Sequence, residues 1–287
     1  MDNKVTKHSG YVYNSKTREG FQKMKAHGIV MPPFRIEDTV TNLLTNHYDR
    51  LITKIEQAAK GMAYLEKAIG DSTEEYRWNL QDSMLGSIPS DKEKLARQLA
   101  IQLDKAQLSF FDNFVDDAPP RVGLAVQFAL DKDEVFQSRL DGLMEKFLAN
   151  SIERVTHEEN TLKSAFLMDL NDYVLGKSKD LNGLKGVIDA MKETSVREAR
   201  FFARDQFARL NKAMTTTSLE QAGAIYGEVI TVGDGRVRLT HRAINHHVYR
   251  LDDLPNELSE YLCRCGVVPR FDYHGKVYRS DGTSYSV

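Results

Sequence analysis

Thiol and imidazole side chains, which are well suited to binding a metal ion, are concentrated near the C-terminal end of this 287-residue sequence. The candidate ligands in this stretch are Cys263, Cys265, His241, His246, His247 and His274. Zinc is commonly held by cysteine sulfur and histidine nitrogen, so the stretch predicts at most one structural zinc site. It would use both cysteines, His241 and one further histidine, with His274 preferred. The same residue types also pack and form hydrogen bonds without a metal, and this alternative stays open.

The spacing of the two cysteines limits how they could act together. Cys263 and Cys265 are two positions apart, so both thiols would point to one face if residues 262–268 form a strand. Structural zinc sites more often leave two residues between their cysteines, inside a tight turn. The spacing therefore permits shared ligation but favours a packing role.

A nuclease is the enzymatic alternative. His241, Asn245, His246 and His247 follow the His-Asn-His order of metal-dependent nucleases. Those enzymes distribute the motif over a β-hairpin and a helix, whereas here it occupies seven residues. The sequence also has no P-loop, dinucleotide fingerprint or G-x-S-x-G motif. We therefore expect a protein that is not an enzyme, with a zinc-dependent nuclease or toxin-type effector as the alternative.

Two motifs in this region carry a family resemblance, D-x-R-V-R-x-x-H and C-R-C. They are formed by Asp234, Arg236, Arg238, His241, Cys263, Arg264 and Cys265. Upstream stand Ala203-Arg204-Asp205 and Asn211. Together these residues resemble the phage Mu F-like head morphogenesis family, the minor head (minor capsid) proteins, over the last third of the chain.

The sequence departs from the family pattern at two places. Tyr226 precedes the presumed strand as the family pattern suggests, but Val229 and Ile230 stand where a tryptophan is usual. The glycine common after the histidine segment is replaced by His246 or His247. Neither departure affects the arginine, histidine or cysteine positions.

The resemblance implies a structural and assembly protein whose motif is a fold signature. Such a protein would act at the portal vertex in procapsid assembly and in DNA packaging or ejection. Its implied partners are the portal protein and other head proteins. It would lie in the virion, inside the head, after assembly in the host cytoplasm.

The two motif arginines suggest a salt-bridge network. In a strand, Arg236 and Arg238 would share one face while the valine between them enters the core. Asp234, Asp252 and Asp253 are available carboxylate partners. A structural arginine–aspartate network is favoured over direct contact with a ligand.

The elements that must position these residues predict an α+β fold that is mainly α. The expected domains are a basic arm over residues 1–38, an elongated helical body over 39–194, and a small β-rich C-terminal domain over 195–287. In the body, apolar residues of the segment 39–69 follow gaps of four and three, which predicts a long amphipathic helix. Its seam could be a bundle core or a docking surface. A helix starting near Ser90, with Glu93 as capping partner, and a helical stretch over 121–150 that continues to Tyr173 are also expected.

The C-terminal domain is predicted to open with two capping boxes and continue with strands. Ser195 with Glu198 would start one helix, and Ser218 with Gln221 a second, short one. The period then drops to two, which predicts short strands at residues 229–232, 237–239, 248–251, 262–268 and 276–279.

Charge is distributed unevenly along the chain. Residues 1–35 carry seven basic and two acidic side chains, and residues 197–212 carry five and two. The arm also holds four aromatic side chains that could anchor a protein partner: Tyr11, Tyr13, Phe21 and Phe34. The four arginines of the later segment are Arg197, Arg200, Arg204 and Arg209. They could bind DNA phosphates without sequence preference, but the aromatic side chains favour the portal as the partner of the arm.

No apolar run approaches the roughly 18 residues that span a bilayer, and the first 20 residues lack the apolar centre of a signal peptide. No membrane association is expected.

Overall fold

The computed structural model describes residues 34–69, 88–174 and 184–287, together with Gln22, Met24, Ile29, Ser83, Leu85 and Gly86. The predicted anchors Tyr11, Tyr13 and Phe21 lie outside the described residues, as does the side chain of Phe34. Their role stays a prediction.

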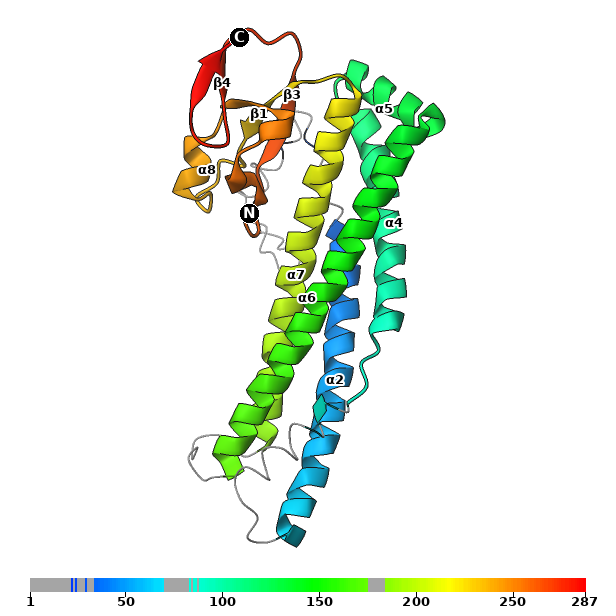
Figure 1. The fold of residues 1–287 in the computed structure, drawn as a ribbon, viewed down its shortest axis with the longest axis vertical. Helices are drawn as coiled ribbons and strands as arrows, with labels where there is room; N and C mark the ends of the chain where they lie inside the picture. The colour runs from blue at the N-terminus through cyan, green and yellow to red at the C-terminus, as the bar shows by residue number, and fades with distance from the viewer. Residues whose placement is uncertain are drawn as a thin grey trace, which may run out of the picture. The chain divides into compact units, whose positions relative to one another are not determined.

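Long helices make up most of the described chain (Figure 1). They are α2 (Phe34–Ile69), α4 (Lys92–Asp117), α5 (Pro120–Lys132), α6 (Glu134–Val174) and α7 (Leu184–Gln221). Helix α2 confirms the long helix predicted over residues 39–69. Its seam residues Leu44, Tyr48, Leu51 and Ile55 are at most 3 % exposed, so this part of the seam is core.

The predicted stretch over residues 121–150 is interrupted at Asp133. The carboxylate of Asp133 accepts hydrogen bonds from the backbone N–H groups of Val135 and Phe136, both at 3.0 Å. These bonds satisfy donors of the first turn of α6, so Asp133 caps the new helix. Hydrogen bonds to those amides lower the pKa of Asp133, as an N-terminal helix cap should.

Two predicted helix starts are wrong, because α7 runs without a break from Leu184 to Gln221. Ser195 lies in the middle of this helix, is 1 % exposed, and donates its hydroxyl to the backbone oxygen of Lys192. Ser218 lies fully buried in the last turns of the same helix. The predicted domain boundary at residue 195 therefore falls inside α7.

The helix start near Ser90 is confirmed to within two residues, but Ser90 itself is not the cap. Its hydroxyl donates to Glu159 at 2.6 Å. The same carboxylate oxygen lies 2.6 Å from Nε2 of His47, and both His47 and Glu159 are about 2 % exposed at their side chains. Burial alone would raise the pKa of Glu159, but the hydrogen bonds from His47 and Ser90 outweigh it and lower that pKa.

The chain divides into two compact units. The sheet unit comprises residues 1–38, 101–147 and 201–287, and the helical unit comprises 39–100 and 148–200. Helices α2, α4, α6 and α7 each contribute residues to both.

A five-stranded sheet forms the C-terminal part of the sheet unit. Its strands are β1 (Tyr226–Ile230), β2 (Val248–Arg250), β3 (Gly266–Arg270), β4 (Lys276–Tyr278) and β5 (Ser284–Ser286), in the order β3-β1-β2-β4-β5. β1 pairs antiparallel with β2 and β3, β2 pairs parallel with β4, and β4 pairs antiparallel with β5. The strands predicted at 229–232, 248–251 and 276–279 are confirmed with shifted ends.

Part of the predicted arm belongs to the core of this unit. Met24 and Ile29 are 1 % and 5 % exposed, and they form an apolar cluster with Ile230 and Val232 at the end of β1. The close approach is visible at Gly266 of β3, where an added Cβ would lie 2.7 Å from carbon atoms of Ile29. Two side chains of the segment predicted as a basic arm therefore contribute to the core of the sheet unit.

The predicted fold class, α+β and mainly α with a small β-rich C-terminal unit, is confirmed. Within the described part of the chain, none of the helices is long and apolar enough to cross a membrane.

Candidate metal centre

His241 is placed by a turn and a short helix rather than by the predicted strand at residues 237–239. The carboxylate of Asp234 accepts the backbone N–H of Arg236 at 3.0 Å, and the backbone oxygen of Asp234 accepts that of Val237 at 3.2 Å. The chain then enters helix α8 (Leu239–Ala243), with Arg238 at its N-cap position. Aspartate closes such turns readily, and the turn replaces the strand here. His241 is 2 % exposed on this helix.

The cysteines lie in a turn before β3, so the predicted strand over 262–268 is wrong at its start. Leu262 has a φ of 56°, in the left-handed region, and Cys263 donates its backbone N–H to the oxygen of Glu260. The N–H of Cys265 points to the sulfur of Cys263 at 3.4 Å. The two thiols therefore converge through a tight turn, which is the setting in which zinc-binding cysteines are commonly found.

His241, Cys263 and Cys265 form a group that could hold a metal ion. Nδ1 of His241 lies 3.2 Å from Sγ of Cys265 and 3.5 Å from Sγ of Cys263. The three ligand atoms all lie within 4.8 Å of one another, and all three residues are buried. A tetrahedral zinc with typical bond lengths separates nitrogen from sulfur by about 3.6 Å. The two nitrogen–sulfur distances are thus close to what such an ion requires.

The second ring nitrogen of His241 faces a charged pair. Nε2 lies 3.0 Å from Oε2 of Glu260, and Nη1 of Arg238 donates to the same oxygen at 2.8 Å. Nη2 of Arg238 also donates to the backbone oxygen of Tyr261 at 2.7 Å. The hydrogen bond with His241, together with the charge of Arg238, lowers the pKa of Glu260. Glu260 is therefore ionised and accepts the N–H of His241.

The two buried thiols have different proton affinities. The hydrogen bond between them lowers the pKa of Cys263 and raises that of Cys265, and the positive charge of Lys212 on α7 further favours the Cys263 thiolate. A thiolate is the form that binds a metal. The hydrogen bond from Cys265 and the charge of Lys212 thus both favour the form of Cys263 that a metal binds.

An ion pair joins the two motifs. Arg264 donates from Nη1 and Nη2 to the two carboxylate oxygens of Asp234, at 2.8 and 2.9 Å. These hydrogen bonds lower the pKa of Asp234 to about 2. Of the arginine–aspartate pairs expected from the sequence, Arg236 with Asp234 is confirmed, at 3.2 Å. Arg238 pairs with Glu260 instead, and Asp252 pairs with Arg250.

The Ala-Arg-acidic segment on α7 also reaches the cysteine turn. Oδ1 of Asp205 accepts the backbone N–H of Leu262 at 2.8 Å, while Oδ2 pairs with Arg209 at 2.9 Å. Ala203 is fully buried and Asn211 is 7 % exposed. Arg204 contacts buried Glu37 at 3.4 Å and is 15 % exposed, so it does not belong to an open basic face.

The other histidines lie in separate environments. His274 is exposed and does not join the group, which corrects its choice as a ligand. His246 bonds Glu228 at 2.6 Å, and the ring of His247 stacks on Tyr278 at 3.8 Å. Asn245 accepts hydrogen bonds from Thr231. The four residues of the His-Asn-His interpretation are thus not gathered around one point.

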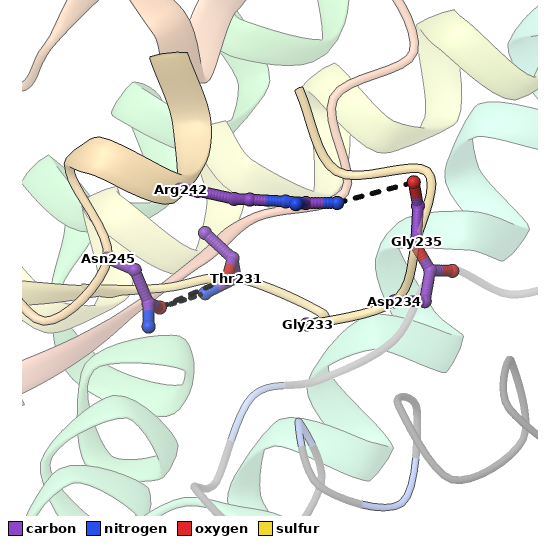
Figure 2. Close-up of a pocket in the computed structure, with 6 residues that line it drawn as sticks. All are labelled: Thr231, Gly233, Asp234, Gly235, Arg242 and Asn245. Carbon is purple, nitrogen blue, oxygen red and sulfur yellow. Dashed lines mark hydrogen bonds between the residues drawn. The ribbon is translucent and has the colours of Figure 1, made fainter. Parts of the chain in front are cut away.

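A shallow pocket of about 340 Å³ lies beside this region, lined by Thr231, Gly233, Asp234, Gly235, Arg242 and Asn245 (Figure 2). The Arg242 side chain extends along it and donates to the backbone oxygen of Gly235 at 3.3 Å. Asn245 and Thr231 bond each other at one end, as Figure 2 shows. The polar groups that line the pocket largely bond one another.

Sequence reasoning missed Glu260 and Lys212 as neighbours of His241, Cys263 and Cys265. Glu260 is 19 positions from His241, and Lys212 is farther still from Cys263, so no sequence motif links either charged residue to its partner. Asp205 did have a signal, because it is the acidic residue of the Ala-Arg-acidic segment.

No family model matches this sequence, and no curated protein or solved structure matches it.

Proposed function

We propose that this chain is a phage minor head protein that acts in head morphogenesis at the portal vertex. The observation that carries the proposal is the convergence of the separate parts of the motif on one place. Asp205 bonds the cysteine turn, Asp234 bonds Arg264, and His241 contacts both sulfurs. A sequence signature that specifies one small domain should bring its residues together in this way.

The backbone at His246 gives independent support. His246 has a φ of 65°, a conformation that favours glycine over residues with a side chain. It is one of the two residues, with His247, that stand where the family commonly carries glycine. A glycine would suit the backbone conformation that the chain has here, which agrees with the family pattern.

The metal held by His241, Cys263 and Cys265 would be a single structural zinc. Thiolate and imidazole ligands suit zinc, and all three residues are at most 5 % exposed. A catalytic metal must be reached by substrate, so this burial supports a structural role over the nuclease or toxin-type alternative.

The proposed partners are the portal protein and other head proteins, in the virion. Nonspecific DNA binding is a weaker expectation, because Arg204 and Arg209 already pair with carboxylates. The aromatic residues of the arm remain the proposed portal contacts.

Titration of the purified full chain with portal protein, and separately with random-sequence duplex DNA at low salt, tests the function. Saturable portal binding is expected, and it should be lost when residues 1–20 are deleted. This deletion retains Met24 and Ile29, so the apolar cluster with Ile230 stays intact. DNA binding without portal binding would refute the proposal.

A further inference from the structure

We infer that His241 binds the metal through Nδ1, and that Glu260, held in place by Arg238, is the positioning residue that fixes this orientation of the imidazole. The inference rests on the proposed zinc at this site and names the arrangement that prepares it.

The two nitrogens of the ring face different groups. Nδ1 lies 3.2 and 3.5 Å from the sulfurs, whereas Nε2 lies 3.0 Å from the carboxylate of Glu260. An ionised carboxylate only accepts hydrogen bonds, so Nε2 carries the proton, which makes Nδ1 the nitrogen whose lone pair can bind a metal. That lone pair is directed toward Cys263 and Cys265, where a metal would be bound. Arg238 is 3.5 Å from Nε2, too far to compete with the carboxylate.

Glu260 is a poor candidate for a ligand in this geometry. It approaches the ring at the nitrogen that faces away from the sulfurs, and it is not one of the residues whose ligand atoms lie within 4.8 Å of one another. Its side chain is 42 % exposed, while the three ligands are buried. A carboxylate that accepts the second N–H of a ligating histidine fixes the tautomer and raises the basicity of the ring.

Arg238 gives the carboxylate a fixed position. Its guanidinium donates hydrogen bonds to Glu260 and to the backbone oxygen of Tyr261, which stands two residues before Cys263. Arg238 thus links the N-terminus of α8 to the turn that carries the sulfurs. Arg238 and His241, the last arginine and the histidine of D-x-R-V-R-x-x-H, then belong to the same site. Among the described residues, the atoms grouped for ligation are those of His241, Cys263 and Cys265.

Zinc affinity of the untagged full chain, measured by competition with a chromophoric chelator, tests the role of Glu260. Glu260→Ala should weaken binding about 10- to 100-fold, as loss of such outer partners commonly does. Glu260→Gln, which keeps a carbonyl oxygen for the N–H, should weaken it less. Glu257→Gln is the matched control, because Glu257 lies one turn earlier and does not bond His241. The zinc affinity of this variant should equal that of the unchanged protein. Circular dichroism of each variant should remain unchanged, since residue 260 is exposed.

The ring atom is identified separately by loading the chain with ¹¹³Cd and labelling its histidines with ¹⁵N. Coupling of cadmium to Nδ1 of His241 is expected, with a proton on Nε2. Coupling to Nε2, an affinity of Glu260→Ala within twofold of the unchanged protein, or no metal binding at all would overturn the inference. Failure to bind portal protein with Nδ1 coupling intact would refute the proposed head function and leave this inference standing.

Discussion

The ion pair between Asp234 and Arg264 should stabilise the sheet unit by about 2 kcal/mol near neutral pH. Its side chains are 5 % and 19 % exposed, and the pKa of Asp234 falls from an ordinary 3.8 to about 2. Each pKa unit corresponds to about 1.4 kcal/mol of preference for the charged form in the folded state. Asp234→Asn keeps the shape and the acceptor for the Arg236 N–H but removes the charge, so it should lose most of this contribution.

The pH dependence has a definite sign. Because the pKa of Asp234 is lowered in the folded state, its contribution is fully present above the ordinary aspartate pKa near 4. It is lost as the pH falls from about 4 through the folded value of about 2. The Asn variant should lack this component of acid destabilisation.

Amide hydrogen exchange of β1 and the cysteine turn measures the effect locally. A loss of about 2 kcal/mol lowers protection about 30-fold. The matched control is Asp252→Asn: Asp252 makes the same two-bond pair with Arg250, but the side chains are 62 % and 46 % exposed. An exposed pair contributes roughly 0–1 kcal/mol, so the control should change protection by less than about fivefold. Equal effects of the two substitutions, or an acid loss that persists in Asp234→Asn, would refute the reasoning.

Three further substitutions test the packing. Phe110→Ala removes a side chain that is 1 % exposed and should lower the free energy of unfolding by about 3–5 kcal/mol, measured in urea by circular dichroism. Leu108→Ala is the control, because this side chain is 67 % exposed and its loss should change that free energy by less than about 0.5 kcal/mol. Equal costs would contradict the assignment of the core. Gly227→Ala in β1 should lower the free energy of unfolding by about 1–3 kcal/mol, and with it the melting temperature, because the new methyl would collide with a side chain of β3. An unchanged melting temperature would argue against the pairing of β1 with β3. His47→Ala should cost about 3 kcal/mol in the same unfolding assay, because it removes a partner of the buried Glu159 carboxylate, and a neutral result would show that the pair is not buried in solution.

The long helices could be predicted because their apolar residues follow the helical period over many turns. The same period shows why the capping boxes at Ser195 and Ser218 failed. Val187, Met191 and Ala199 continue one buried stripe through Ser195, and a four-residue capping pattern is outweighed by packing along the whole helix. The short strands were harder to predict, because a few residues give only a weak period of two. A turn at Asp234 and a left-handed residue at position 262 replace the ends of two predicted strands, and these are the segments that carry the site.

The metal-binding group could be predicted in part. Its sulfur and imidazole residues are rare enough to be noticed, and the structure brings His241, Cys263 and Cys265 together as a group that could hold a metal ion. The choice of His274 was wrong because proximity in sequence was taken for proximity in space. Glu260 could not be found, since its role depends on how α8 packs against the turn.

The proposed head function implies that a phage or prophage encodes this chain, and quantitative mass spectrometry of particles purified from that source tests it most directly. If the proposal is right, the chain is present in full particles and in portal-containing procapsids, at a small fraction of the copy number of the major capsid protein. Its absence from both kinds of particle, when the portal protein is detected in the same samples, would contradict the assignment as a minor head protein.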